Sequence, residues 1–86
     1  MSLSFEIVTA RGVTFREDCL ERVVVRRREE RFVPGSEIAI YPHHGPLLMQ
    51  TQACEMRLTR EGTTRSMAVD AGVLEIWKDR VTLVIT

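Results

Sequence analysis

The sequence has no excess of either charge, no long apolar run and little glycine, proline or cysteine. Twelve basic residues balance twelve acidic ones, which removes the net positive charge typical of nucleic-acid and anionic-membrane binders. Apolar runs are only a few residues long, as in Val23–Val25, whereas a membrane-spanning helix needs about 20 such residues. No charged segment followed by an apolar one opens the chain, so we expect no secretory signal. The composition predicts one small globular domain over residues 1–86.

Residues that carry chemistry are also scarce. The chain has two cysteines, Cys19 and Cys54, and we expect both to be reduced, buried core filler. Its only histidines, His43 and His44, are adjacent, so on a strand they would point to opposite faces, and no further histidine could complete a metal site. Neither a spaced nucleophile signature nor a glycine-rich phosphate loop is present. We therefore expect no enzyme activity, no cofactor and no metal.

The sequence does contain segments in which apolar and polar residues alternate with a period of two. Apolar and charged residues alternate throughout Cys54–Leu58, and Val81–Ile85 follows the same pattern. Phe5–Val8 and Gly72–Trp77 alternate less strictly but are rich in β-branched and aromatic residues. The segment Leu20–Val25 ends in three valines, which predicts a strand covered on both faces. Each of these segments is predicted to be a strand.

Turn residues separate the predicted strands at short intervals. They occur at Ala10–Gly12, Pro34–Ser36, Arg60–Gly62 and Lys78-Asp79, and Arg60–Gly62 is typical of a hairpin loop. No segment of ten or more residues has a helical apolar stripe. The sequence therefore predicts an all-β fold, a small sandwich or flattened barrel of eight to ten short, mostly antiparallel strands.

One segment breaks the alternation. Arg26–Arg31 contains six consecutive charges, four arginines and two glutamates. We interpret it as a solvated hairpin tip or edge segment whose charges discourage pairing between sheet edges. The alternative, an anion or RNA contact, is less favoured because no aromatic residue is interleaved with the arginines.

A second distinctive segment is the proline-rich stretch Tyr41–Pro46. Pro42 and Pro46 cannot donate to a sheet ladder, so the segment is predicted to form a bend at an end or edge of the sandwich. Leu47 and Leu48 are expected to return the chain to the core. A bend there would present His44, together with Tyr41 or His43, to a neighbouring molecule. The alternative is a bend that serves only to turn the chain.

Five segments, read in order, resemble one known family. They are Phe5–Phe15, Leu20–Val25, Ile40–Leu48, Asp70–Ile76 and Lys78–Leu83. The sharpest, Ile40–Leu48, reads Ile-Tyr-Pro-His-His-Gly-Pro-Leu-Leu. It is similar to the signature Ile-Leu/Tyr-Pro-Gly-His-Ala-Pro-Leu-Leu in the N-terminal domain of the epsilon subunit of rotary ATP synthases, called delta in mitochondria. His44 falls on the signature histidine, whereas His43 replaces the signature glycine and Gly45 its alanine.

The resemblance implies a function and partners. Such a domain is a non-catalytic rotor subunit of the central stalk, which docks on the gamma subunit and the c-ring and couples ring rotation to the catalytic head. It would lie on the cytoplasmic face of the bacterial inner membrane as a peripheral part of the complex, without direct membrane insertion and without a nucleic-acid partner. The partner-interface residues it implies are Glu37, Tyr41, His43 and His44, of which the acid at Glu37 would face the polar loops of the ring.

The chain departs from the family pattern in two places. The stretch Arg26–Ser36 is longer than the usual link, and only Gly35–Glu37 resembles it. The chain also stops at Thr86, where members continue into two helices that inhibit ATP hydrolysis, so no C-terminal helical hairpin is expected in this fold. A short family member, a divergent paralogue and an excised domain remain alternatives. The alternative function is a free-standing β-sandwich that binds another protein.

Overall fold

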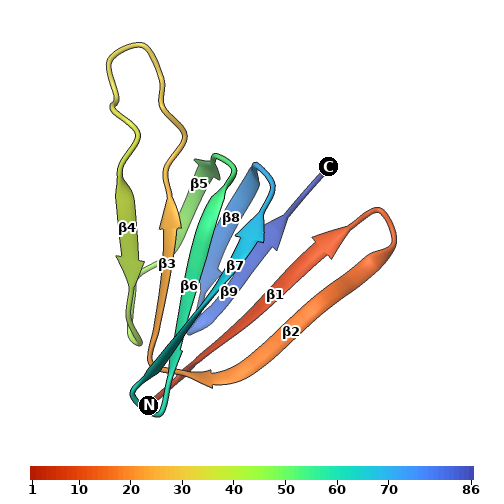
Figure 1. Ribbon diagram of the computed structural model, residues 1–86, viewed down its shortest axis with the longest axis vertical. Helices are drawn as coiled ribbons and strands as arrows, with labels where there is room; N and C mark the ends of the chain where they lie inside the picture. Colours follow the sequence, from red (N-terminus) through yellow and green to blue (C-terminus); the bar gives the residue numbers. More distant parts are fainter.

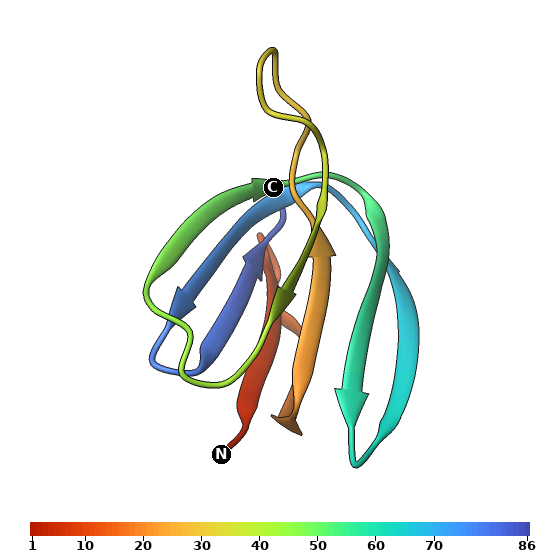
Figure 2. The ribbon, with the colours of Figure 1, turned by 90° about the vertical axis from the view of Figure 1, so that its left-hand side faces the viewer.

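The computed structural model describes residues 1–86, and it contains nine strands and no helix. The strands are β1 (Leu3–Thr9), β2 (Gly12–Leu20), β3 (Arg22–Arg26), β4 (Glu37–Ile40), β5 (Leu47–Thr51), β6 (Cys54–Arg60), β7 (Thr63–Val69), β8 (Gly72–Trp77) and β9 (Arg80–Val84). They form a five-stranded sheet, β2-β1-β9-β8-β5, and a four-stranded sheet, β4-β3-β6-β7 (Figures 1 and 2). Every pairing is antiparallel except β1 with β9. The predicted all-β sandwich is therefore confirmed, and the two sheets do not close into a barrel.

The alternation in the sequence explains how the two sheets share a core. On β8, Leu74 and Ile76 are almost fully buried, whereas Glu75 and Trp77 between and beyond them are exposed. Strands β1, β5, β6 and β9 likewise turn alternate residues inward, as a sandwich requires. The core contains fifteen buried apolar side chains: Leu3, Phe5, Ile7, Leu20, Val23, Val25, Ile40, Met49, Met56, Leu58, Val69, Leu74, Ile76, Val81 and Leu83.

The predicted strand Leu20–Val25 is in fact divided between the two sheets. β2 ends at Leu20 in the five-stranded sheet and β3 begins at Arg22 in the four-stranded one. The backbone of Cys19 has a φ of 61°, in the left-handed region, at an irregularity in the register of β2 with β1, one residue before β2 ends. Periodicity missed the division because apolar residues continue on both sides of it. The three valines of β3 are all buried, as predicted.

The expectation that both thiols fill the core is wrong for Cys19. That side chain is exposed on the edge strand β2, whereas Cys54 is half-buried and packs against the core. Both cysteines are free. The core position next to Cys19 is taken instead by Leu20, which is fully buried at the end of the strand.

Three of the predicted turns are two-residue hairpin loops, and two of them share one turn type. In the β6–β7 loop, Glu61 and Gly62 have φ values of 51° and 76°, and in the β8–β9 loop Lys78 and Asp79 have values of 50° and 61°. Positive φ at both central residues defines the type I′ turn, whose twist matches that of the flanking strands. These loops fix the registers of β7 and β9.

The charged run forms a long hairpin between β3 and β4, as predicted. This charged hairpin, residues 27–36, projects beyond the sheets along the long axis of the molecule (Figures 1 and 2). Its base is tied by backbone hydrogen bonds from Arg27 N to Ser36 O (2.8 Å) and from Arg28 N to Gln50 O (3.0 Å). The second bond reaches β5 of the other sheet, so the charged hairpin bridges the two sheets at its base.

Candidate partner-binding surfaces

The four predicted interface residues lie at opposite ends of one strand. Glu37 begins β4 at the end of the sandwich that carries the charged hairpin. Tyr41, His43 and His44 follow β4 at the other end, where the chain turns into β5 (Figure 1). With a rise of about 3.3 Å per residue, the backbones of Glu37 and Tyr41 are separated by roughly 13 Å. The structure therefore brings three of the four residues together and separates the fourth from them.

At the end with the histidines, the proline bend is held by local hydrogen bonds. The backbone N–H of His43 donates to Oδ1 of Asp79 (2.7 Å), which joins the bend to the β8–β9 turn. The carbonyl oxygen of Gly45 accepts a hydrogen bond from Nδ1 of His44 (2.6 Å). This bond requires a proton on Nδ1 and leaves Nε2 of His44 without a partner in the chain. The bend lies at an end of the sandwich, as predicted, and both histidines are exposed.

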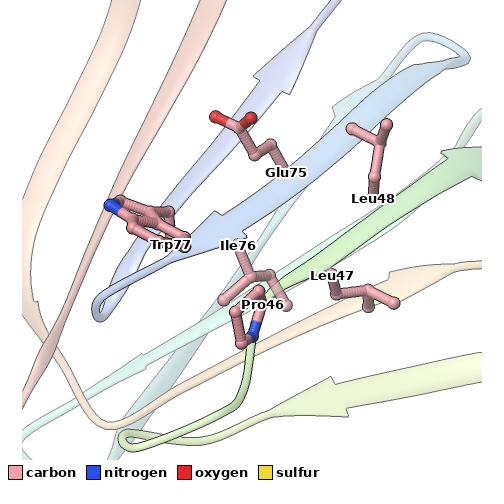
Figure 3. Close-up of a pocket in the computed structure, with 6 residues that line it drawn as sticks. All are labelled: Pro46, Leu47, Leu48, Glu75, Ile76 and Trp77. Carbon is pink, nitrogen blue, oxygen red and sulfur yellow. The ribbon is translucent and has the colours of Figure 1, made fainter.

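Beside the bend lies an apolar hollow of about 250 Å³ (Figure 3). Leu48 and Trp77 stand on the outer face of the five-stranded sheet with Glu75 between them, and Pro46 lies at the foot of β5. The side chains of Leu48 and Trp77 are 71% and 52% exposed. A hollow of this size is small for a cofactor but suits one or two apolar side chains of a protein partner.

The outward position of Leu48 corrects an expectation. Of the two leucines predicted to return to the core, only Leu47 does so, because it pairs with buried Ile76, whereas Leu48 pairs with exposed Glu75. Sequence reasoning also missed Trp77 as an exposed residue. The sequence did indicate this position, because Trp77 is two residues after Glu75 on the same strand and residues two apart lie on the same face of a sheet.

A second apolar area crosses the same outer face. Val8 on β1 pairs with Val13 on β2 and with Val84 on β9, and Val84 pairs with Val73 on β8. These four residues, the valine row, thus form an unbroken line over four strands, and Val13 is 57% exposed. Contiguous exposed apolar side chains mark surfaces that a partner covers. The sequence could not reveal this row because its members come from four distant segments.

At the other end, Glu37 is held by an ion pair. Its two carboxylate oxygens accept hydrogen bonds from the guanidinium of Arg57, at 2.7 and 3.2 Å. The hydrogen bond and the positive charge of Arg57 lower the pKa of Glu37 below its ordinary value, and Arg26 adds to the effect. The carboxylate is therefore firmly ionised and exposed beside the charged hairpin. It can present negative charge to a partner, but only together with Arg57.

The tip of the charged hairpin carries an aromatic residue that the interpretation of the charged run overlooked. Glu30 and Val33 exchange two backbone hydrogen bonds (2.8 and 3.1 Å), so Arg31 and Phe32 form the tip. The guanidinium of Arg31 lies 5.1 Å from the centre of the Phe32 ring, and Phe32 is 85% exposed. The signal was present in the sequence, since Phe32 directly follows the run.

The structure groups no three His, Cys, Asp or Glu side chains in a way that could hold a metal ion. Nor does it contain a helix of the length and apolar character needed to cross a membrane. The features on its surface are apolar areas and ion pairs, which suit binding to other macromolecules.

Comparison with known proteins decides the family. Residues 2–86 match the β-sandwich domain of ATP synthase delta and epsilon chains. The chain belongs to this family. It is 38% identical over 81 residues to an ATP synthase epsilon chain of Dehalococcoides mccartyi, which covers 92% of the chain and 51% of that protein. It is 32% identical over 82 residues to the epsilon chain of Bacillus licheniformis, which covers 95% of the chain and 57% of that protein.

The match confirms the resemblance in the sequence, but it covers only part of each relative. A third relative, the epsilon chain of a Roseiflexus species, is 29% identical over 83 residues, or 96% of the chain and 55% of that protein. The chain thus spans about half the length of the relatives it matches. The matched parts cover 92–96% of the chain.

Proposed function

We propose that this chain is a non-catalytic central-stalk subunit of an ATP synthase that couples rotation of the c-ring to the catalytic head. The observation that carries the proposal, beside family membership, is the presence of two different surfaces at opposite ends of β4. A connector between two rotating parts needs two separate contact surfaces and a stiff body between them. A sandwich whose strands share fifteen buried core residues provides that stiffness.

The gamma subunit is the proposed partner of the end with Tyr41, His43 and His44. Next to these residues, Leu48 and Trp77 offer the exposed apolar side chains that dominate protein interfaces. Glu75 makes no ion pair within the chain, so a basic side chain of gamma at this point would find an acidic partner. The valine row extends the same face and would be covered by the same partner.

The c-ring is the proposed partner of the end with Glu37. This end is polar rather than apolar, because Glu37, Arg57 and the arginines of the charged hairpin surround it. A polar, charged surface suits contact with the polar loops of a membrane ring. In this position the chain is a peripheral part of the complex on the cytoplasmic face of the membrane.

Site-specific crosslinking in the assembled ATP synthase of the source organism tests the proposal. Cys19 and Cys54 are first replaced by serine, since the exposed thiol of Cys19 would itself react. In this background Tyr41→Cys is expected to crosslink to gamma and Glu37→Cys to the c-ring, with Ala68→Cys on the exposed face of β7 as a control. Failure of the chain to enter the complex would favour the alternative, a free-standing interaction module, and crosslinks to the same subunit from both ends would contradict the two-surface proposal.

A further inference from the structure

The charged hairpin carries a local positive charge that the neutral total of the whole chain does not reveal. The whole chain is neutral, but the run Arg26–Arg31 has four arginines against two glutamates, a net charge of +2. The rest of the chain is therefore net negative. A neutral total argued against an anionic-membrane binder, yet a local basic segment acts on a surface at short range, because charges beyond roughly 8–10 Å are screened in physiological salt.

The tip adds an apolar anchor to this charge. Phe32 is 85% exposed and does not pack against the hydrophobic core of the sandwich. The arrangement of an isolated aromatic ring with arginines beside it is typical of segments that lie in the interface of a bilayer, where the ring meets the acyl boundary and the guanidinium groups meet phosphates. A protein interface, by contrast, surrounds its aromatic anchor with further apolar contacts.

The shape of the charged hairpin allows such contact. The tip is closed by the two hydrogen bonds between Glu30 and Val33. The base is closed by the bond from Arg27 N to Ser36 O and is tied to β5 by the bond from Arg28 N to Gln50 O. Figures 1 and 2 show it projecting past all nine strands, so a flat surface would meet it before the sheets. Because the hairpin is ordered before binding, little conformational entropy opposes the contact.

We propose that the tip of the charged hairpin, Arg31 and Phe32, contacts anionic phospholipid headgroups, with Arg26 and Arg28 adding to the attraction. The proposal rests on the proposed function in one respect only: contact with the membrane ring would bring this end of the chain close to a bilayer. It concerns the headgroup layer and does not require the chain to enter the hydrocarbon core. One aromatic ring and a few arginines give weak, reversible binding.

The test uses fluorescence of a single indole at the tip. In a Trp77→Phe background, Phe32→Trp places the only indole of the chain on the charged hairpin, and circular dichroism confirms that the variant is folded. We expect a blue shift on vesicles of phosphatidylcholine with phosphatidylglycerol, no shift on phosphatidylcholine alone, and loss of the shift at high salt. Adding Arg28→Ser and Arg31→Ser should weaken binding about 25-fold, at about fivefold for each arginine near an anionic surface. The matched control, Val13→Trp in the same background, should show no shift.

Three results would overturn the proposal. No shift on any vesicle would show that the tip does not bind lipid, and an equal shift on neutral vesicles would show that the arginines do not recognise headgroup charge. A comparable shift with polyuridylic acid would assign the tip to polyanions in general, RNA included. Because the assay uses the isolated chain, each of these results is independent of whether the chain enters an ATP synthase.

Discussion

The backbone N–H of His43 lies 2.7 Å from Oδ1 of Asp79, and both residues have left-handed backbones, with φ values of 68° and 61°. The hydrogen bond locks the proline bend onto the β8–β9 turn. The positive φ of His43 also explains why the family signature has a glycine at this position. The signature has glycine where this chain has His43, and the structure shows that this position requires a positive φ, which glycine adopts without a steric penalty.

Replacing His43 by glycine should therefore stabilise the protein. A non-glycine residue in the left-handed region costs about 1–2 kcal/mol, of which the extra entropy of unfolded glycine cancels part. We expect His43→Gly to raise the free energy of unfolding by about 0.5–1 kcal/mol in urea denaturation. A loss of stability would show that the imidazole of His43 makes contacts that outweigh the backbone strain.

Removing the acceptor at Asp79 should have the opposite effect. Asp79→Ala deletes the bond to His43 N–H and places alanine at a positive φ, so we expect a loss of about 1–2 kcal/mol. Asp79→Asn keeps an acceptor oxygen and a residue that tolerates the left-handed region, and it should cost much less. Equal losses in the two variants would mean that the charge of Asp79, rather than this hydrogen bond, supports the turn.

Alanine substitutions at two glycines, one crowded and one in open space, test how closely β8 approaches β9. A Cβ atom at Gly72 would lie 2.3 Å from the carbonyl oxygen of Val84, so the strands would have to move apart. We expect Gly72→Ala to destabilise the protein by about 1–3 kcal/mol. At Gly45 a Cβ would meet nothing within 4 Å, and Gly45→Ala should change the free energy of unfolding little. Similar effects of the two substitutions would contradict the close approach of β8 and β9.

The ion pair of Glu37 and Arg57 predicts a pH dependence of stability. Because Arg57 lowers the pKa of Glu37 in the folded protein, the stabilising effect of the pair is fully present above about pH 4.5, the ordinary pKa of glutamate. It is lost as the pH falls further through the lowered pKa. Urea denaturation should find Glu37→Gln slightly less stable than the parent between pH 5 and 7, with a difference that shrinks in more acidic solution. A difference that stays constant down to pH 2 would contradict the ion pair.

The arginines at the base of the charged hairpin should matter little for folding. The bonds that tie this base involve the backbones of Arg26, Arg27 and Arg28, which serine would preserve. Replacing all three by serine should change the free energy of unfolding by about 0–1 kcal/mol, since exposed charges contribute little. A loss of several kcal/mol would show that their side chains are packed or paired.

The sequence located β1, β6, β8 and β9 because burial in a sandwich follows local alternation of apolar and polar residues. It indicated the inward positions of β6, β8 and β9 and the turns between them, all of which depend on neighbours in the chain. It failed at Leu48, because Leu47–Met49 is apolar without alternation and the sequence does not say which of the three points outward. The partner of each residue across the sheet decides that, and this partner lies far away in the chain.

The candidate surfaces were less predictable for the same reason. The signature around His44 located one end of the sandwich, but the sequence could not show that Glu37 lies at the other. Nor could it show the valine row, which exists only because the registers of β2, β1, β9 and β8 align its members. Surfaces formed from several strands depend on register, and register is set by contacts between distant segments.

The affinity of the chain for the gamma subunit of its own ATP synthase, measured by calorimetry, tests the proposed docking surface most directly. We expect binding by the parent chain. His44→Ala and Trp77→Ser should each lose more than about 1 kcal/mol of affinity, as residues in an interface do. Their melting temperatures should stay close to that of the parent, because both side chains are exposed, and Ala68→Ser on β7 should retain full affinity. Undiminished affinity in both variants, or no binding of gamma by the parent chain, would contradict the proposed docking surface.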